Sequence, residues 1–391
     1  MRFSRNVDML EPSATLALAA RARRLREEGR SIVNLSAGEP VYGTPDFAAH
    51  AGIEAIRAGR LGYPPNQGIP ELRRAIVDYL GDTTGSAGLD PDGVLVSAGV
   101  KQALFNCLFC LAGPGDEVLV PTPCWTSYRP QVRLAGAEPV VVESTWEDGF
   151  HVAVDRLEAA RTDATRVLLL NSPNNPSGAV YDLDSLRAIA EWASGHGVWI
   201  LSDEIYRRLR FGEGPAPSLL DLGELPDRAV VLDGVSKAFA MTGWRIGFAL
   251  GPRELIRKAS DLQSQTTSGA AAPSQYAAAA AFGRIEEREA VVADFLDRLG
   301  ETRRLATEGL AGTPGLEVRP PEGGIFLWAR ISGAASSAQV AEGLLEAGVA
   351  CIPGEAFESP GHLRFNLAVE PSDLREGVRR VRSYFESLAR A

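Results

Sequence analysis

The chain has 391 residues, of which 45% are hydrophobic and 23% charged, the usage of an ordinary globular protein with room for two domains and a large shared core. Its formal net charge of -10 argues against nucleic-acid binding, because affinity for a phosphate backbone depends on clustered lysine and arginine. The amino terminus lacks the apolar core of a signal peptide, and no apolar run approaches the length of a membrane span. We therefore expect a cytoplasmic protein that has no membrane partner.

Short apolar runs rich in Val, Leu and Ile recur along the chain, with helical stretches between them. The runs lie at residues 94–96, 117–120, 139–142, 167–170, 198–201, 230–232 and 245–250. Such alternation is typical of an α/β fold, in which helices wrap a mainly parallel sheet.

The pattern changes after about Phe282, where a long charged helical stretch runs from Glu286 to Gly309. It predicts a connector into a second, smaller α+β domain, with strands at residues 323–328 and 363–367. We predict a large domain over residues 41–285 and a small domain formed by residues 1–40 together with 286–391.

Cysteine and histidine give no sign of a metal site. Cys107 and Cys110 have C-x-x-C spacing, but they lie in an apolar run inside a predicted helix, which favours core packing. The four histidines form no ligand cluster in the sequence, so no metal is expected.

The first candidate site element follows the strand at residues 94–96. Ser97-Ala98-Gly99 ends this strand, and an apolar helical run follows. The backbone N–H groups of Gly99, Val100 and Lys101 would point into a helix amino terminus, where phosphate binds well. Taken alone, the segment could also be a plain glycine turn.

Two further segments follow buried strands. Residues 171–178 form a turn dense in Asn, Pro and Gly, which taken alone could equally be an ordinary loop. The strand at 198–201 leads to Asp203 at its carboxyl end, with Tyr206 just beyond. Catalytic groups of open α/β sheets lie at that edge, and an acid there can keep the pyridine nitrogen of pyridoxal phosphate protonated.

Lys237 lies between two apolar runs, and Arg245 follows eight positions later. Partial desolvation lowers the pKa of a lysine and frees its amine for Schiff-base chemistry, while the fixed fork of an arginine suits a phosphate dianion. The pair predicts a place that holds an aldehyde and a phosphate. A buried lysine paired with a carboxylate is the alternative for this segment alone.

Together these segments resemble the class I/II aminotransferases, which are fold-type I pyridoxal-phosphate enzymes, over essentially the whole chain. The motifs that carry the resemblance occur in the family's order at residues 34–40, 62–64, 68–73, 97–99, 123–125, 174–176, 202–206, 236–237 with Arg245, and 363–366. Their ordered concurrence is far more specific than any one of them.

The resemblance implies pyridoxal 5′-phosphate as cofactor, bound by the large domain, with Lys237, Asp203 and Tyr206 as catalytic residues. The implied cofactor contacts are Gly99, Val100, Lys101, Trp125, Asn175, Asp203, Tyr206, Ser236, Lys237, Arg245 and Tyr63. Trp125 would cover one face of the ring, although it could also be a core tryptophan. Asn175 and Tyr206 would donate hydrogen bonds to the phenolic oxygen of the cofactor.

The resemblance also implies a homodimer and a set of substrate contacts. Tyr63 matches a tyrosine that reaches the phosphate of the neighbouring protomer, although a surface tyrosine in a Pro-rich loop is the alternative. The implied substrate contacts are Arg364, Gly38, Asn175, Trp125, Lys101 and Thr15. Arg364 matches the arginine that binds the α-carboxylate in bidentate fashion, with a strand-edge ion pair as its alternative.

Residues 263–269 contain no arginine, so the chain does not resemble the aspartate aminotransferases that take a substrate-binding arginine from that region. It resembles the bacterial branch that uses a lysine, here Lys101 with Thr15 nearby. This favours a dicarboxylic substrate, aspartate or glutamate with 2-oxoglutarate or oxaloacetate. Alternatively, Lys101 faces solvent or pairs with a protein carboxylate.

The expected reaction is a ping-pong transamination between an amino acid and a 2-oxo acid, in which Lys237 moves a proton as general acid and base. Use of aromatic or other neutral amino acids remains an alternative, and so does a lyase reaction of the same fold. A regulator without catalytic activity is disfavoured, because only some thirty residues precede Asn34, too few for a DNA-binding module.

Overall fold

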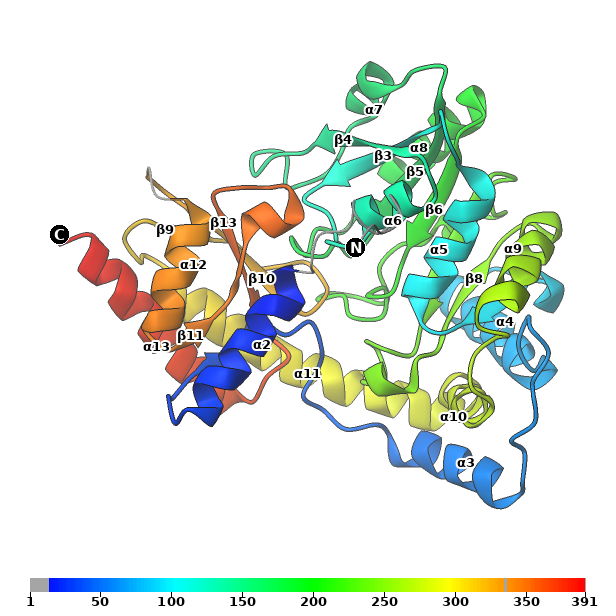
Figure 1. The fold of residues 1–391 in the computed structure, drawn as a ribbon, viewed down its shortest axis with the longest axis horizontal. Helices are drawn as coiled ribbons and strands as arrows, with labels where there is room; N and C mark the ends of the chain where they lie inside the picture. The colour runs from blue at the N-terminus through cyan, green and yellow to red at the C-terminus, as the bar shows by residue number, and fades with distance from the viewer. Residues whose placement is uncertain (1–13, 334–335, 391) are drawn as a thin grey trace, which may run out of the picture.

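The structure, a computed structural model, describes residues 14–333 and 336–390. Its main element is a seven-stranded sheet in the order β2-β8-β7-β6-β5-β3-β4 (Figure 1). The strands are β2 (Val94–Ser97), β3 (Glu117–Thr122), β4 (Glu138–Glu143), β5 (Thr165–Asn171), β6 (Trp199–Asp203), β7 (Ala229–Gly234) and β8 (Gly247–Leu250). Only β8 runs antiparallel to its neighbours, so the prediction of a mainly parallel α/β sheet is confirmed.

The predicted strand boundaries at residues 245 and 323 are wrong. The strand expected at residues 323–328 begins only at Phe326 and continues to Ile331. The run at residues 245–250 was expected to be extended throughout, but β8 begins only at Gly247. Arg245 has a φ of 55°, in the left-handed region, which cannot continue a strand. The backbone turn at Arg245 matters for the site, because it precedes β8 at the edge of the sheet where the predicted site residues lie.

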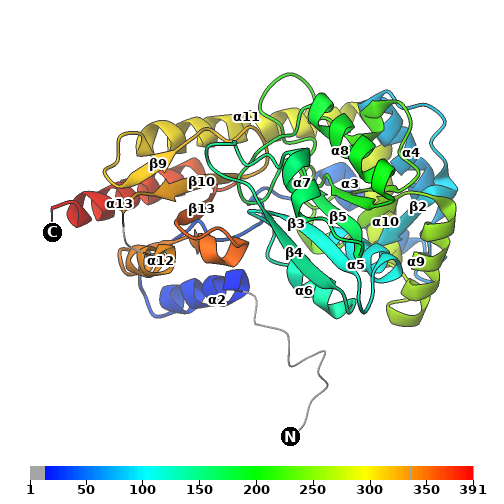
Figure 2. The same ribbon diagram turned by 90° about the horizontal axis from the view of Figure 1, so that it is seen from above.

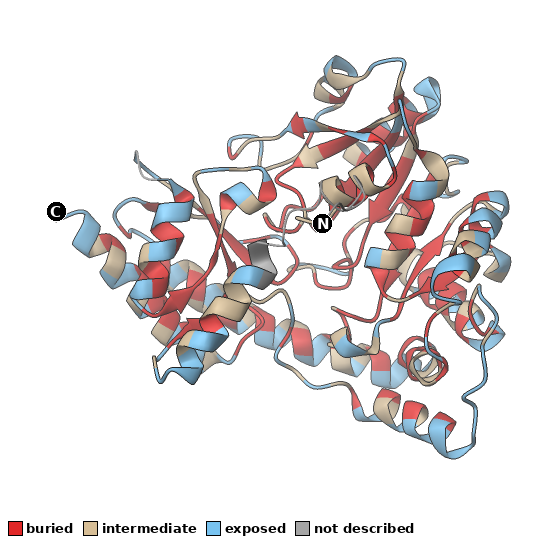
Figure 3. Ribbon diagram, viewed as in Figure 1, coloured by how far each residue is buried: buried red, intermediate tan, exposed pale blue. Residues whose placement is uncertain are grey.

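Helices cover both faces of the seven-stranded sheet (Figures 1 and 2). They are α3 (Asp46–Arg57), α4 (Pro70–Thr84), α5 (Val100–Leu111), α6 (Tyr128–Leu134), α7 (Val154–Ala160), α8 (Leu183–His196), α9 (Arg253–Thr266) and α10 (Ala272–Gly283), with short 3-10 helices η1 (Pro91–Gly93), η2 (Leu219–Leu222) and η3 (Thr242–Trp244). Alternate residues of β6 enter the two cores: Leu201 packs in one and Ile200 in the other. Figure 3 shows the strands as the most deeply buried part of the chain. Cys107 is also buried in the first core, with Cys110 packed against it, as expected for core cysteines.

The helix α11 (Ile285–Leu310) leads from this part of the molecule to a smaller one (Figure 1). The predicted connector at 286–309 is thus confirmed as one continuous helix. The smaller part contains α2 (Ala14–Glu27), β1 (Val33–Asn34), β9 (Leu316–Val318), β10 (Phe326–Ile331), α12 (Ser337–Glu346), β11 (Val349–Ala350), β12 (Ile352–Pro353), η4 (Gly354–Phe357), β13 (His362–Asn366) and α13 (Pro371–Leu388).

The smaller part has an antiparallel four-stranded sheet in the order β12-β13-β10-β9. The short strand β1 pairs in parallel with β11, so the amino-terminal segment lies beside the carboxyl-terminal one. The division at residues 41 and 286 stays a prediction. Within the described residues, no helix is both long and apolar enough to cross a membrane.

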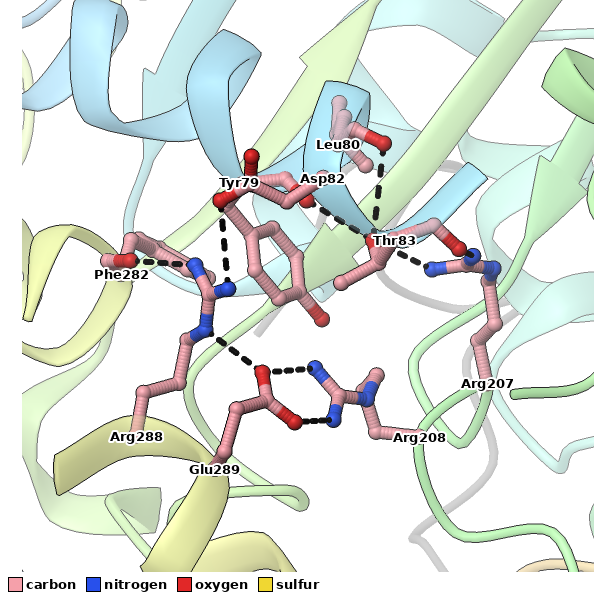
Figure 4. A network of polar contacts seen from close by, with 9 residues as sticks. All are labelled: Tyr79, Leu80, Asp82, Thr83, Arg207, Arg208, Phe282, Arg288 and Glu289. Carbon is pink, nitrogen blue, oxygen red and sulfur yellow. Dashed lines mark hydrogen bonds and ion pairs between the residues drawn. The ribbon is translucent and has the colours of Figure 1, made fainter. Parts of the chain in front are cut away.

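Arginines anchor the loop that follows β6, and Figure 4 shows their contacts. Arg207 donates a hydrogen bond to Thr83 Oγ1 at 3.0 Å, and Arg208 makes a two-pronged ion pair with Glu289 of α11. Arg207 and Arg208 are both buried. Because charged hydrogen bonds of this kind are stronger than neutral ones, they fix the backbone next to Tyr206.

Candidate active site

A cavity of about 390 Å³ lies at the carboxyl edge of the seven-stranded sheet, closed on the other side by residues of the smaller part. It brings together most of the predicted site residues, although they come from distant segments of the chain. Those that line it are Gly38, Val100, Lys101, Trp125, Asn175, Asp203, Tyr206, Ser236, Lys237, Arg245 and Arg364.

Three predicted residues do not line the cavity. Gly99 lies just behind it as the residue that precedes α5, with a φ of +82° and the Arg245 guanidinium where a Cβ would be, so only glycine fits. Tyr63 is 95% exposed, in the loop before α4. Thr15 belongs to α2, but its side chain lies outside the described part of the structure.

Lys237 presents a half-buried amine to the cavity. Its Nζ donates a hydrogen bond to the carbonyl oxygen of Gly38 at 2.6 Å and lies 5.9 Å from the centre of the Tyr206 ring. Burial, aided by the positive charge of Arg364, lowers the pKa of Lys237 to about 8. No carboxylate among the described residues forms an ion pair with it, so the alternative of a salt-bridged lysine is not what this structure has. An amine with this pKa is far more often unprotonated at neutral pH than an ordinary lysine.

Asp203, the last residue of β6, is a buried carboxylate at the bottom of the cavity. Burial raises its pKa to about 6, although Tyr128 Oη donates to its Oδ2 at 2.7 Å and the Ile205 N–H donates to its Oδ1 at 3.2 Å. These two hydrogen bonds favour the charged form and fix the orientation of the carboxylate. Asp203 is therefore placed to hold a buried cationic N–H group of a ligand.

Asn171 joins the strand that carries Asp203 to the loop that carries Asn175. Its Nδ2 donates to the backbone oxygen of Asp203 at 2.8 Å, and its Oδ1 accepts from the Asn175 N–H at 2.7 Å. Asn175 and Tyr206 are both buried, and burial raises the pKa of Tyr206. The hydroxyl of Tyr206 is thus a neutral donor in this cavity.

One end of the cavity gathers N–H donors and positive charge. The helix α5 begins there at Val100, which gives free backbone N–H groups and the positive end of the helix dipole. Ser236 and Arg245 line the same cavity. The guanidinium of Arg245 donates to the backbone oxygens of Thr242 at 3.0 Å and Ala98 at 3.2 Å, both neutral acceptors. This end is suited to a phosphate.

Arg364 of β13 lies at another side of the cavity and is buried. It donates to Asn175 Oδ1 and to the backbone oxygen of Ser36, both at 3.0 Å, and its Nε has no partner among the described residues. Burial lowers its pKa to about 10, an effect that Tyr206 offsets only in part, and no described carboxylate pairs with it. The alternative of a strand-edge ion pair is thus absent, and a buried guanidinium without a counter-ion suits a carboxylate ligand.

Lys101 leaves the first turn of α5 with its ammonium 4.9 Å from the centre of the Trp125 ring. Partial burial and the charge of Arg245 lower its pKa. As with Arg364, no carboxylate of the described residues pairs with it, so the ion-pair alternative does not describe this side chain. Lys101 is exposed, as the solvent-facing alternative expects.

The sequence reasoning missed several side chains that line the cavity. Tyr128 matters most for the site, because it is buried and its hydroxyl donates a hydrogen bond to Asp203. Asn171, Glu39 and Thr242 also line the cavity, and the hydroxyl of Thr242 donates to Glu39 at 3.2 Å. A possible signal for Tyr128 was its position three residues after Trp125.

Nearly the whole chain is similar to known aminotransferases. The family described as "Aminotransferase class I and II" matches residues 30–381. An aspartate aminotransferase of Streptomyces avermitilis is 39% identical over 395 residues, covering 97% of this chain and 95% of that protein. An aspartate/prephenate aminotransferase of Thermus thermophilus is 39% identical over 380 residues and covers 97% of both chains.

Solved structures give the same result. The aspartate aminotransferase from Thermus thermophilus with maleate superposes with a TM-score of 0.94 at 39% identity, covering 98% of this chain and 100% of that one. An aspartate aminotransferase from Rhizobium meliloti gives a TM-score of 0.92 at 33% identity and covers 99% of both chains.

Proposed function

This chain belongs to the class I and II aminotransferases, and we propose that it transfers the amino group between aspartate or glutamate and 2-oxoglutarate or oxaloacetate. Enzymes of the family use pyridoxal 5′-phosphate, which supplies an aldehyde that accepts the amino group and a conjugated ring that stabilises a carbanion. The reaction is a ping-pong exchange between an amino acid and a 2-oxo acid.

The cavity fits this cofactor in three respects. The amine of Lys237 is half-buried and has a lowered pKa, as attack on an aldehyde requires. No cation among the described residues is hydrogen-bonded to the buried carboxylate of Asp203, so it can accept an N–H group. The start of α5 and Arg245 provide donors for a phosphate.

We assign the residues to the following roles. Lys237 would bind the cofactor and would move a proton to and from the substrate Cα. Asp203 would hold the ring nitrogen in its protonated form, and Asn175 and Tyr206 would donate to the phenolic oxygen. Trp125 would cover the ring. The phosphate contacts are the N–H groups of Gly99, Val100 and Lys101 with Ser236, Arg245 and the Tyr63 of a second subunit.

One observation carries the choice of a dicarboxylic substrate. Besides Lys237 and Arg245, which would bind the cofactor, the cavity contains two cations, Arg364 and Lys101, that no described carboxylate pairs with. Arg364 would bind the α-carboxylate of the substrate, together with Asn175 and Gly38. Lys101 and Thr15 would bind the distal carboxylate. The relatives named aspartate aminotransferase support this choice. The Thermus relative named for prephenate as well favours a second candidate acceptor, prephenate, which is also a dicarboxylic 2-oxo acid.

Replacing Lys101 tests the substrate class. We expect Lys101→Ala to raise KM for aspartate and 2-oxoglutarate by more than about tenfold, roughly 1.4 kcal/mol, because it removes the counter-charge of the distal carboxylate. Kinetics with alanine and phenylalanine should stay nearly unchanged. Lys258→Ala is the matched control, since Lys258 is an exposed lysine of α9. Equal effects on acidic and neutral donors would leave an aminotransferase of another specificity.

We also propose a homodimer with shared sites. Tyr63 is almost fully exposed, and Ile53, Ile56 and Leu61 nearby are exposed apolar side chains on α3 and the loop after it. A group of apolar side chains of this kind is suited to a subunit interface. We expect the protein to sediment as a dimer at micromolar concentration; a monomer that remains active would contradict shared sites. A cytoplasmic location is likewise proposed, and cell fractionation tests it.

A further inference from the structure

A column of contacting ring side chains connects the loop after β4 with Arg364. The column consists of Trp146, His362, Trp328 and Phe357. The rings of Trp328 and His362 are 5.0 Å apart and nearly parallel at 6°. The His362 ring also lies 6.1 Å from the Trp146 ring, tilted by 31°. Trp328 contacts the edge of Phe357 at 5.5 Å, and the Arg364 guanidinium lies 4.8 Å from the Phe357 ring.

The outer end of the column is clamped from the four-stranded sheet. The Arg319 guanidinium lies 4.3 Å from the centre of the Trp146 ring and donates to the Trp146 backbone oxygen at 2.5 Å. Arg330 lies 5.0 Å from the same ring and forms an ion pair with Glu147 at 2.6 Å. Two cations on one indole hold the loop after β4 against the smaller part of the molecule.

The inner end is fixed as well. The Cys124 N–H, next to Trp125, donates to the backbone oxygen of Phe357 at 3.1 Å. Arg364 also lies 4.0 Å from the ring of Phe326, and a cation that packs on aromatic rings takes its orientation from them. A shift of Phe357 would therefore tilt the guanidinium of Arg364.

The column contains polar ring nitrogens, which side chains that only fill the core would not need. The Nε1 of Trp328 and the Nε2 of His362 are buried without hydrogen-bond partners among the described residues. Burying each of these nitrogens without a partner costs free energy of folding, a cost that an aliphatic side chain would not have. The flat rings instead contact one another in a fixed series, one pair stacked, one tilted and one edge-on, so each ring limits the movement of the next.

We propose that this column positions Arg364 for the substrate α-carboxylate, with Trp146 as the positioning residue at its far end. The inference rests on the proposed role of Arg364. Trp146 acts through His362, Trp328 and Phe357 and does not touch the substrate itself.

The test measures the dissociation constant of succinate, a non-reactive dicarboxylate, by calorimetry on the holoenzyme. We expect Trp146→Ala to weaken succinate binding by about threefold to thirtyfold, the range of remote coupling energies, and to raise KM while leaving kcat within about twofold. Trp146→Phe, which keeps a ring, should restore most of the affinity. The control is Trp192→Ala, because Trp192 is a buried tryptophan of α8 outside the column; it should lower Tm and leave succinate binding unchanged.

A double-mutant cycle separates positioning from general destabilisation. His362→Ala interrupts the column in its middle, so its effect and that of Trp146→Ala should not add in the double variant. Additive losses, a normal affinity in Trp146→Ala, or an equal loss in Trp192→Ala would overturn the inference. Arg364→Ala serves as the reference variant. If it binds succinate normally, Arg364 does not bind the carboxylate and the proposed function is wrong. If only Arg364→Ala loses affinity, the proposed function stands and the role of the column is wrong.

Discussion

Lys237→Ala should reduce turnover by about 10⁴-fold or more, because it removes the group that attaches the cofactor and the group that moves the proton. The chain has only three lysines, Lys101, Lys237 and Lys258. Borohydride reduction of the yellow holoenzyme followed by peptide mapping should therefore give one labelled peptide, containing Lys237. Label on Lys101 or Lys258 would refute the assignment, and Lys258→Ala should keep wild-type activity.

The pH dependence of cofactor attachment is a second readout of Lys237. Since burial lowers the pKa of this amine to about 8, the cofactor-free protein should react faster with pyridoxal phosphate as the pH rises through 8. Below that pH the amine is protonated and has no free electron pair. A rate that increases only near the pKa of an ordinary lysine would show that the amine is not desolvated.

Asp203→Asn should keep the cofactor but lose activity by about 10² to 10³-fold, the scale for removing one preorganised electrostatic partner. An amide fills the same space and carries no charge, so it cannot hold the ring nitrogen protonated. Turnover and cofactor content of the purified variant check this expectation. A variant with wild-type rates would assign the charge to another residue.

Tyr128→Phe provides the matched control for Asp203. The Tyr128 hydroxyl donates to the carboxylate and lowers its pKa, so removing the hydroxyl should raise that pKa. Because the charged carboxylate is the working form, activity should then fall at a higher pH on the acid side of the profile, with less change at pH 8. An unchanged acid limb would mean that the two side chains are not coupled.

Some site residues could be predicted from the sequence because they belong to short local motifs. Lys237, Asp203 and Arg245 each follow or precede an apolar strand, and the carboxyl edge of a parallel sheet brings such positions together. Arg364 was predicted only through the family motif at residues 363–366, and its lack of a carboxylate partner became visible only in the structure.

Other features depend on contacts between distant segments, which no local pattern reports. Tyr128 bonds to Asp203, 75 positions away. The column from Trp146 to Arg364 joins three separate segments of the chain. The turn at Arg245 was missed because the apolar residues after it predict one continuous strand, and an apolar pattern does not report the left-handed backbone that Arg245 adopts.

One half-reaction decides whether this protein is a dicarboxylate aminotransferase. Holoenzyme mixed with L-aspartate, without any oxo acid, should lose the absorbance of its aldehyde form while releasing oxaloacetate in an amount equal to the sites present. Addition of 2-oxoglutarate should then restore the absorbance and yield glutamate. If the absorbance stays unchanged, or if aspartate loses carbon dioxide or ammonia instead of exchanging its amino group, the account of a dicarboxylate aminotransferase is wrong.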